Sequence, residues 1–195
     1  MMKIVLLIIF AFILGSIPFG VIIAKIKGVD LKKIGSGNIG ATNVLRSLGK
    51  GPAAITLLGD VLKGTAAVAI GRYFGLELFY EGLVGLSAIF GHNFSIFLGF
   101  KGGKGVATSI GVIALYAPQT ALFTLIIWLA VVLITRYSSM GALVSFGLLP
   151  VNMAIFDSKE KLPVAILITV FIVIRHRENI RRLIDGTERK VGQRT

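Results

Sequence analysis

Long apolar runs, separated by short polar stretches, fill most of this 195-residue chain. Hydrophobic residues make up 55% of it and charged residues only 15%, whereas soluble globular domains average about 45–50% and about 25%. The mean hydropathy is +0.87. A membrane-spanning helix needs about 20 apolar residues, and shorter ones are tolerated where neighbours bury them. The sequence therefore predicts an all-α integral membrane protein, packed as one membrane-embedded domain over residues 1–195.

Seven segments are predicted to form a bundle of transmembrane helices, some of them marginal in length. Pro18 is expected to kink the first helix. The fourth ends at Ala117-Pro118, and it either crosses the membrane fully or forms a re-entrant pair with the fifth. The first run is too long for the apolar region of a signal peptide, and no cleavage site follows it. The spans are residues 4–26, 52–75, 82–99, 105–117, 119–136, 140–156 and 162–175, followed by a tail over residues 176–195.

The distribution of basic residues predicts how the bundle is oriented, because cytoplasmic loops carry an excess of Lys and Arg. One set of loops, together with the C-terminal tail, contains sixteen basic residues, and the opposite set contains four. The first set is therefore expected to be cytoplasmic, with the N-terminus outside and the C-terminus inside. Termini on opposite sides require an odd number of crossings. Seven crossings meet this requirement, and so do five if one adjacent pair is re-entrant. Topology and anionic ligands thus explain the net charge of +12 better than nucleic acid does.

Three polar segments rich in small residues fall on the predicted cytoplasmic side. Each has an ordinary explanation, because Gly, Ser and Asn favour turns, loop lysines follow from topology, and a basic helix can lie on anionic lipid. In the third segment, however, Arg175, His176, Asn179 and Arg182 recur at three- and four-residue steps and share one helix face. In a shorter fourth segment, Ser138-Ser139 either joins the site or caps the next helix. We predict functional segments at residues 35–46, 91–108, 175–183 and 136–139.

The turn Phe100-Lys101-Gly102-Gly103-Lys104-Gly105 has the composition of an anion-binding site. Consecutive glycines let backbone N–H groups approach an anion without a Cβ in the way, and two lysines lie beside them. A helix that begins near Gly105 would add the positive potential of its N-terminus. The turn is not a Walker A motif, because the chain has Leu98 and Gly105 where that motif requires Gly and then Ser or Thr. ATP hydrolysis is therefore not expected.

His92, Asp60 and Lys63 fall well inside predicted spans, away from their ends, where ionisable groups are costly and usually functional. His92 should lie several residues inside the end of the third span, either as a functional group or as a hydrogen-bonded structural histidine. Asp60 and Lys63 are three residues apart in the second span. They are predicted to form an ion pair that neutralises both buried charges.

Several kinds of catalysis are excluded by residues that the chain does not contain. It has no Cys, which removes thiol catalysis and Cys-ligated metals. Five residues after His92 comes Phe97, and five after His176 comes Arg181, so there is no His-x-x-x-x-Asp dyad. No G-x-S-x-G elbow occurs, and the few acidic residues on the cytoplasmic side cannot form a carboxylate cluster for Mg²⁺. We expect no metal and no cofactor, and a reaction between two anionic partners of which one is already activated.

Residues 35–46, 91–108 and 175–188 closely resemble the motifs of bacterial acyl-phosphate:glycerol-3-phosphate acyltransferases, the PlsY family. Their joint occurrence in this order makes the resemblance specific, and residues 59–64 also resemble the family's second span. The resemblance implies transfer of a fatty acyl group from acyl phosphate to the 1-hydroxyl of sn-glycerol 3-phosphate. The products would be lysophosphatidic acid and inorganic phosphate, in the first acylation of phospholipid biosynthesis. It implies a multi-pass protein of the bacterial cytoplasmic (inner) membrane, with its active site on the cytoplasmic face and no nucleic acid or obligatory protein partner.

The resemblance also suggests which residues form the site. An acyl phosphate is a mixed anhydride with a good leaving group, so the enzyme needs to align the substrates and stabilise the oxyanion and departing phosphate. We assign acyl-phosphate binding to Gly102, Gly103, Lys104, Gly105 and Thr108. We assign glycerol 3-phosphate binding to Ser36, Asn38, Asn43, Arg46, Ser138, His176, Asn179 and Arg182. The candidate catalytic residues are Lys104, Ser36, Asn38, Arg46, His176 and His92.

Two alternatives stay open. The general base is either His92 or His176, since histidine titrates in the useful range, or, as the resemblance suggests, a phosphate oxygen of the acyl phosphate. A small transporter of an organic phosphate would also need a basic vestibule. The chain shows no convincing internal repeat, however, and its polar groups gather on one face instead of crossing the bilayer.

Overall fold

Helices make up all the regular structure in residues 1–193, the part of the chain that the computed structural model describes. The apolar runs account for most of them, as predicted. In chain order the helices are α1 (Met2–Ser16), α2 (Phe19–Ile26), η1 (Leu31–Lys33), α3 (Ala41–Leu48), α4 (Lys50–Tyr73), α5 (Leu78–Asn93), η2 (Ile96–Leu98), α6 (Val106–Tyr116), α7 (Pro118–Thr135), α8 (Ser138–Gly147), α9 (Leu149–Phe156), η3 (Lys159–Lys161), α10 (Leu162–Arg175) and α11 (Arg177–Ile184).

Four segments in the described residues are long and apolar enough to cross a membrane, and the bent pair α8–α9 passes the same test if its two helices are taken as one span. They are residues 2–26, 50–73, 78–98 and 118–135. Helix α6 has 11 residues and is therefore about 16 Å long, roughly half of the ~30 Å hydrocarbon core. The count of seven spans and the orientation of the bundle stay predictions.

Three predicted spans differ from the helices that form. The kink expected at Pro18 is a complete break, because proline lacks an N–H group and its ring excludes the helical path; α1 ends at Ser16 and α2 begins at Phe19. The span predicted over residues 140–156 is two helices that meet at 44°, with Pro150 in the first turn of the second. The span predicted over residues 82–99 ends as a helix at Asn93, where the chain turns into η2.

The helices pack closely because small residues lie where they cross, as is common in membrane bundles. A Cβ atom at Gly64 of α4 would lie 2.3 Å from the carbonyl oxygen of Thr108 in α6, and one at Gly111 of α6 would lie 2.0 Å from the carbonyl oxygen of Val61. The main core joins α5, α6 and α7 to α8, α9 and α10, around residues such as Tyr116, Phe146, Met153, Ile168 and Ile172.

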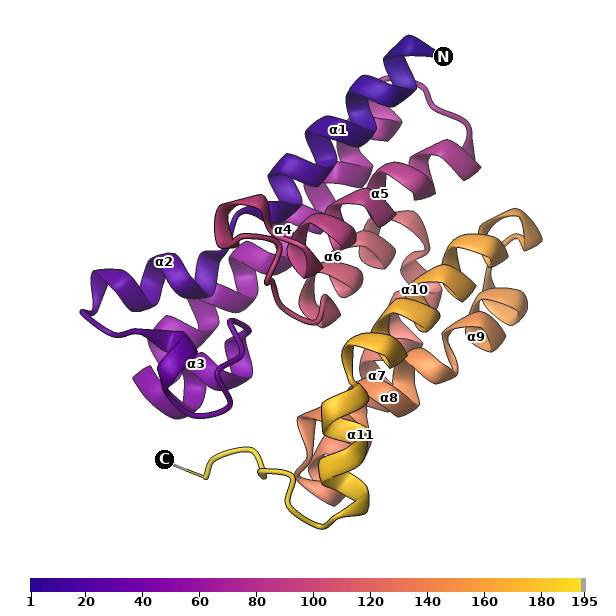
Figure 1. Cartoon of the computed structure of the whole chain (residues 1–195). Helices are drawn as coiled ribbons and strands as arrows, with labels where there is room; N and C mark the ends of the chain where they lie inside the picture. The colour runs from indigo at the N-terminus through magenta and orange to yellow at the C-terminus, as the bar shows by residue number, and fades with distance from the viewer. Residues whose placement is uncertain (194–195) are drawn as a thin grey trace.

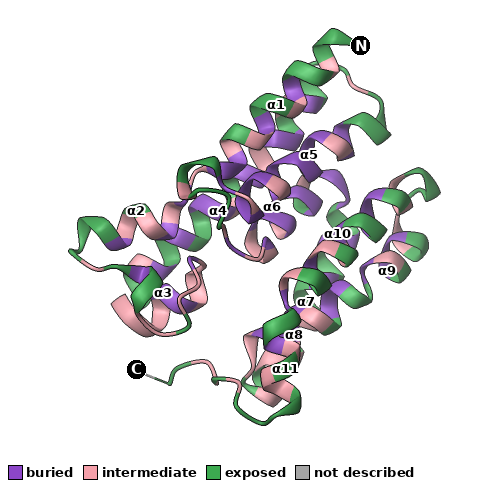
Figure 2. Cartoon of the chain, viewed as in Figure 1, coloured by how far each residue is buried: buried purple, intermediate pink, exposed green. Residues whose placement is uncertain are grey.

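Large apolar side chains cover the outside of the bundle, as expected of a surface that faces lipid. Leu6 of α1, Leu62 of α4 and Leu133 of α7 are all more than half exposed, and Figure 2 shows such exposed stretches alternating with buried ones along the helices. The N-terminus and the last described residues of the C-terminal tail lie at opposite ends of the molecule (Figure 1). Helix α11 and the C-terminal tail lie at the same end as α3 (Figure 1), so the first and third polar segments meet there.

Candidate active site

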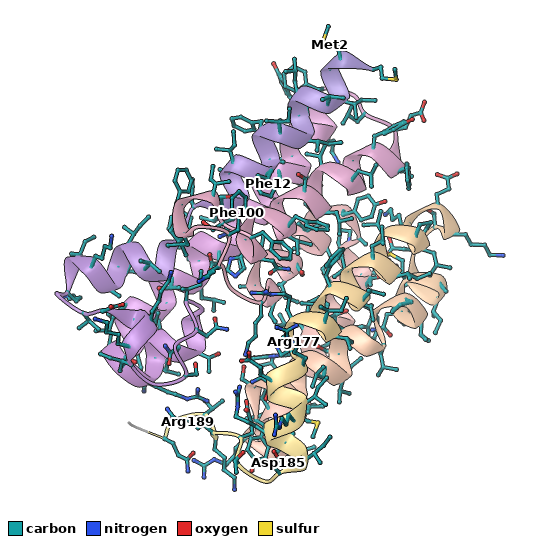
Figure 3. All side chains as sticks on the ribbon, in the orientation of Figure 1. Met2, Phe12, Phe100, Arg177, Asp185 and Arg189 are labelled. Atoms are coloured by element: carbon teal, nitrogen blue, oxygen red, sulfur yellow. The ribbon has the colours of Figure 1, made fainter. Side chains whose placement is uncertain are left out.

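A cavity of about 730 Å³ opens between α3, α4, α6, α7, α8 and α11. Charged side chains gather at the end of the molecule where Arg177, Asp185 and Arg189 lie (Figure 3). The cavity is polar on this side and apolar on the other. Its polar wall contains Glu188 and eleven of the residues selected from the sequence, which are Ser36, Asn38, Asn43, Arg46, His92, Lys104, Gly105, Ser138, His176, Asn179 and Arg182.

The glycine turn is folded back against the end of α5. The N–H of Gly103 donates to the carbonyl of His92 (2.9 Å), and the N–H of Gly102 donates to the carbonyl of Asn93 (3.2 Å). A Cβ at Gly103 would lie 2.1 Å from Nε2 of His92. The prediction that these two glycines offer their N–H groups to a phosphate is therefore wrong. They are required because the turn passes too close to His92 for any side chain.

Arg175, the last residue of α10, holds the same turn from its other side. Its Nε and Nη2 donate to the carbonyl of Gly103 at 3.0 and 2.9 Å, and Nη2 also donates to the carbonyl of Gly102 at 3.2 Å. A guanidinium presents several N–H donors in a fixed fork, which suits this double contact. Arg175 was grouped by sequence with the residues of α11 but was given no role; it is a positioning residue for the turn.

The donors that the turn leaves free lie one residue further on. Among the described residues, the N–H groups of Val106, Ala107 and Thr108 at the start of α6 have no protein acceptor. Val106 and Ala107 line the cavity. The unpaired N–H groups at a helix N-terminus attract anions, so the donors open to an anion are those of the first turn of α6 and not those of Gly102 and Gly103. The side chain of Thr108 is buried and does not line the cavity, so its backbone N–H is the group that remains available for the predicted binding.

Lys104 reaches across the cavity from the turn to α11. Its Nζ donates to Oδ1 of Asn179. Burial lowers the pKa of the Lys104 ammonium to about 8, with Glu188 acting in the opposite direction. The ammonium is therefore held on a polar wall where an anionic ligand would meet it.

The loop before α3 is shaped by one buried amide. The Oδ1 of Asn43 accepts from the N–H of Ser36 (2.9 Å), and its Nδ2 donates to the carbonyls of Asn38 (2.9 Å) and Ile34 (3.1 Å). Both amide N–H groups and one lone pair of the amide oxygen are thus bound to the loop. Asn43, which is predicted to bind glycerol 3-phosphate, therefore holds the loop that presents Ser36 and Asn38 to the cavity. Asn38 itself accepts from the N–H of Gly40 at 2.9 Å, which leaves its Nδ2 free.

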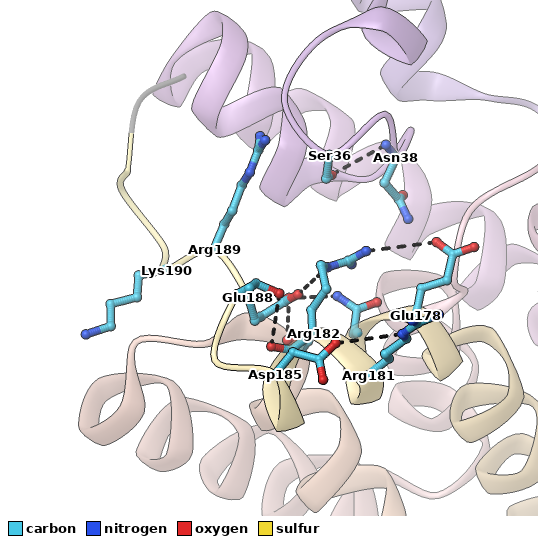
Figure 4. A network of polar contacts seen from close by, with 12 residues as sticks. Ser36, Asn38, Glu178, Arg181, Arg182, Asp185, Glu188, Arg189 and Lys190 are labelled. Atoms are coloured by element: carbon cyan, nitrogen blue, oxygen red, sulfur yellow. Dashed lines mark hydrogen bonds and ion pairs between the residues drawn. The ribbon is translucent and has the colours of Figure 1, made fainter.

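Glu188 in the C-terminal tail ties the third polar segment together (Figure 4). Its carboxylate accepts from Ser139 Oγ (2.7 Å), Asn179 Nδ2 (2.7 Å) and Arg182 Nε (2.8 Å). Burial by itself would raise the pKa of Glu188, but these hydrogen bonds outweigh it and the pKa is lower than usual. The sequence reasoning counted Glu188 only as one of a few acids. Its place between Arg182 and Arg189 was the available signal.

The tail also contacts Arg46, the predicted site residue of α3. Nη2 of Arg46 donates to the carbonyl of Arg189 at 2.9 Å. Ser138 lies 3.3 Å from the hydroxyl of Thr42, oxygen to oxygen. Neither Ser138 nor Ser139 caps α8, whose N-cap is Tyr137 without a side-chain bond. The capping alternative is therefore wrong, and these serines connect α8 to α3 and to the tail.

The two histidines are held in opposite ways. Nδ1 of His176 lies 2.7 Å from the carbonyl oxygen of Ile172, and because a carbonyl only accepts, Nδ1 carries the proton and Nε2 is an acceptor. Burial lowers the pKa of His176 to about 4, and Lys104 contributes in the same direction. Nδ1 of His92 instead lies 2.9 Å from Nζ of Lys63. The predicted pair of Asp60 and Lys63 is confirmed, with Oδ1 and Nζ 2.8 Å apart.

The chemical capacity of the cavity follows from these contacts. Among residues 1–193, no group of three or more His, Asp or Glu side chains is arranged to hold a metal ion. The hydroxyl groups that line the cavity contact Asn38, Thr42 and Glu188, and no serine–histidine pair occurs among the described residues. The cavity thus offers ammonium, guanidinium and backbone donors to anions, and a neutral imidazole acceptor.

Known sequences are similar to this chain over almost its whole length. The glycerol-3-phosphate acyltransferase family model matches residues 5–186. A glycerol-3-phosphate acyltransferase of Thermus thermophilus is 47% identical over 185 residues, which cover 94% of this chain and 93% of the relative. One from Mesorhizobium japonicum is 47% identical over 189 residues and 96% of each chain. One from Clostridioides difficile is 46% identical over 190 residues, 94% of this chain and 93% of the relative.

Two solved structures have the same fold. The crystal structure of PlsY (YgiH), an integral membrane glycerol 3-phosphate acyltransferase, in its glycerol 3-phosphate form is 42% identical with a TM-score of 0.91 and covers 97% of this chain and 96% of its own. The lysophosphatidic acid form of PlsY is 41% identical with a TM-score of 0.88 and covers 96% and 95%. With its apolar helices, this chain is a multi-pass membrane protein. It belongs to the PlsY family of glycerol-3-phosphate acyltransferases.

Proposed function

We propose that this protein transfers a fatty acyl group from acyl phosphate to the 1-hydroxyl of sn-glycerol 3-phosphate, forming lysophosphatidic acid and inorganic phosphate. The family supports the acyltransferase activity and glycerol 3-phosphate. The two PlsY structures, in glycerol 3-phosphate and lysophosphatidic acid forms, support the acceptor and the product. A transporter of an organic phosphate is not proposed, because the relatives are acyltransferases.

The observation that carries the proposal is that one cavity joins a cationic wall to an apolar one. On the cationic side are Lys104, Arg46 and Arg182, and on the apolar side are Leu57, Ile110, Leu125, Trp128 and Val132 from α4, α6 and α7. An acyl phosphate has the same two halves, an anionic group and a long apolar chain. We propose that its chain lies along the apolar wall and its phosphate near Lys104 and the start of α6.

The absence of a serine–histidine pair in the described part of the cavity supports an activated donor. In the proposed reaction, the 1-hydroxyl oxygen of glycerol 3-phosphate attacks the carbonyl carbon of the acyl phosphate. The bond between that carbon and the bridging phosphate oxygen breaks, and phosphate leaves with the electron pair. Lys104 and the N–H groups at the start of α6 would stabilise the negative charge on the carbonyl oxygen and the departing phosphate. Arg46 and Arg182 would bind the phosphate of the acceptor.

The hydroxyl proton needs an acceptor, and the two histidines are unequal candidates. Nδ1 of His92 faces the Lys63 ammonium, which only donates, so that nitrogen has no lone pair to offer. Nε2 of His176 is an acceptor on the cavity wall. With a pKa of about 4, His176 is too weak a base to hold the proton at neutral pH. We propose that His176 orients the hydroxyl and that a phosphate oxygen of the donor takes the proton.

The distribution of basic residues also bears on the side of the membrane that the cavity faces. We propose that the cavity faces the cytoplasm in the bacterial inner membrane, as the distribution of basic residues favours. Both phosphorylated substrates would then reach the cationic wall from water, while the acyl chain stays in lipid.

Donor choice tests the proposal directly. Purified protein in detergent would be given glycerol 3-phosphate with palmitoyl phosphate, palmitoyl-CoA or palmitoyl carrier protein, and lysophosphatidic acid would be measured. We expect product from the acyl phosphate alone. Equal or faster acylation from either thioester would contradict the proposed donor while leaving the acyltransferase activity intact.

A further inference from the structure

One buried ammonium connects three helices next to the cavity. Nζ of Lys63 lies 2.8 Å from Oδ1 of Asp60, donates to the carbonyl oxygen of Ile17 (2.8 Å) and contacts Nδ1 of His92 (2.9 Å). Lys63 is 3% exposed and Asp60 2%. The ammonium thus ties α4 to the break between α1 and α2, and to the end of α5.

The contact with His92 fixes the tautomer of that imidazole. An ammonium has three donors and no acceptor, so Nδ1 of His92 must accept and the ring proton lies on Nε2. The same nitrogen, Nδ1, is 3.4 Å from Oδ1 of Asp60, which would favour the other tautomer if Lys63 were absent. Lys63 therefore decides which edge of the ring carries the proton.

The other edge of the ring supports the glycine turn. Nε2 of His92 occupies the place where a side chain at Gly103 would be. The backbone carbonyl of His92 accepts from the N–H of the same glycine at 2.9 Å. Lys104, the next residue, reaches across the cavity to Asn179. A shift of the His92 ring would therefore move the segment that presents Lys104.

We propose that Lys63 is a positioning residue for acyl transfer, with Asp60 as its counter-ion: by donating to Nδ1 of His92 it holds the ring against Gly103 and so fixes Lys104. The proposal deepens the proposed function and rests on it. It assigns His92 a supporting role, as the group that transmits the position of α4 to the turn.

The chemistry of the pair supports a role beyond stability. A buried ion pair is often replaceable by apolar residues of similar volume with little loss of stability. An apolar pair at residues 60 and 63 could join the helices, but it could not donate to an imidazole. The donation is thus the property that only the charged pair provides.

A double substitution separates the two roles. Asp60→Leu/Lys63→Met removes both charges together, so that neither is left buried without a partner. The matched control is Arg72→Met/Glu81→Leu, which removes the 2.7 Å ion pair that joins α4 to α5 far from the cavity. Acyl-phosphate-dependent acylation of glycerol 3-phosphate and the thermal unfolding midpoint would be measured for both.

We expect kcat of the Asp60/Lys63 variant to fall about a hundredfold, because misplacing a catalytic group by about 1 Å has this effect. Its KM for glycerol 3-phosphate should stay within about threefold, since Arg46 and Arg182 are untouched, and its unfolding midpoint should stay close to that of the wild type. The control should keep its kcat. Wild-type kcat in the Asp60/Lys63 variant, or an equal loss in the control, would overturn the proposal.

A spectroscopic measurement does not depend on activity or on the folding of that variant. The chain has two histidines, so ¹⁵N imidazole shifts of the wild type can be assigned by comparison with His176→Gln. We expect His92 to carry its proton on Nε2, with a hydrogen-bonded, unprotonated Nδ1. A proton on Nδ1 of His92 would overturn the proposal. Failure of the proposed function would be distinct, because the wild type itself would then form no lysophosphatidic acid.

Discussion

Nζ of Lys104 donates a hydrogen bond to Oδ1 of Asn179 and so joins the glycine turn to α11 across the cavity. Asn179 in turn donates to Glu188 at 2.7 Å. The charge of the turn and the charges of the C-terminal segment therefore belong to one network, although they are more than 70 residues apart in sequence.

The alkaline limb of the pH–rate profile should report Lys104. Its pKa is lowered to about 8, so the charge is present below that pH and is lost as the pH rises through it. Because kcat/KM reports groups of the free enzyme, we expect it to fall above about pH 8. The second pKa of a phosphate monoester is about 6, so the acceptor does not cause this limb. In Lys104→Arg the positive charge persists to higher pH, so the fall in kcat/KM should move to higher pH. If the fall stays at the same pH, a group other than Lys104 causes it.

His176→Gln should slow the reaction without changing its acid limb. The imidazole is neutral over pH 5–8 because its pKa is about 4, so its replacement removes a hydrogen-bond acceptor and no titrating group. We expect kcat to fall roughly tenfold to a hundredfold, as for loss of a hydrogen bond to a buried polar group. The measurement is the pH dependence of kcat from pH 5 to 8. Disappearance of a limb near pH 6–7 in the variant would show that His176 acts as a base.

Gly103→Ala should damage both folding and activity through a steric clash. The new methyl group would lie 2.1 Å from Nε2 of His92, and forcing one extra carbon into a packed site costs about 1–3 kcal/mol. We expect a lower unfolding midpoint and at least a tenfold loss of kcat, since Lys104 follows directly. The control is Gly51→Ala in α4, where no atom lies within 4 Å of the added carbon. If the two variants behave alike, the close contact with His92 is not what requires glycine.

Glu188→Gln should lose stability in a way that depends on pH. The pKa of Glu188 is lower in the folded protein than its ordinary value of 4.5. The stability from its ionised form is therefore present above about pH 4.5 and is lost as the pH falls through the folded pKa. We expect the wild type to unfold at a higher temperature than the variant at pH 7, and the gap to narrow as the pH falls below 4.5. Glu178→Gln, at a residue 75% exposed, should show little gap at any pH.

Much of the fold and the location of the site follow from local sequence pattern. Apolar run length placed most of the helices, and the sidedness of basic residues brought the polar segments to one end. The spacing of Asp60 and Lys63 predicted their ion pair. Such features depend on residues close in sequence, where helical periodicity fixes the geometry.

The remaining features depend on which helices touch. Whether the N–H groups of Gly102 and Gly103 face a ligand or the carbonyls of α5 depends on how the turn folds back, and composition is the same in both cases. Arg175 finds its acceptors 72 residues away. The loop contacts of Asn43 could not be predicted, because an amide serves equally well to bind a ligand and to hold a loop.

The most direct test of the central claim measures inorganic phosphate and lysophosphatidic acid together. Folded wild-type protein and Lys104→Ala would be given acyl phosphate, with and without glycerol 3-phosphate, and Lys101→Ala would serve as an exposed control. We expect the wild type and the control to release one phosphate per lysophosphatidic acid formed, only when the acceptor is present. Lys104→Ala should lose about 10²–10³-fold in kcat, as for removal of one oxyanion donor. Phosphate release without the acceptor, or a Lys104→Ala variant with wild-type turnover, would contradict the account.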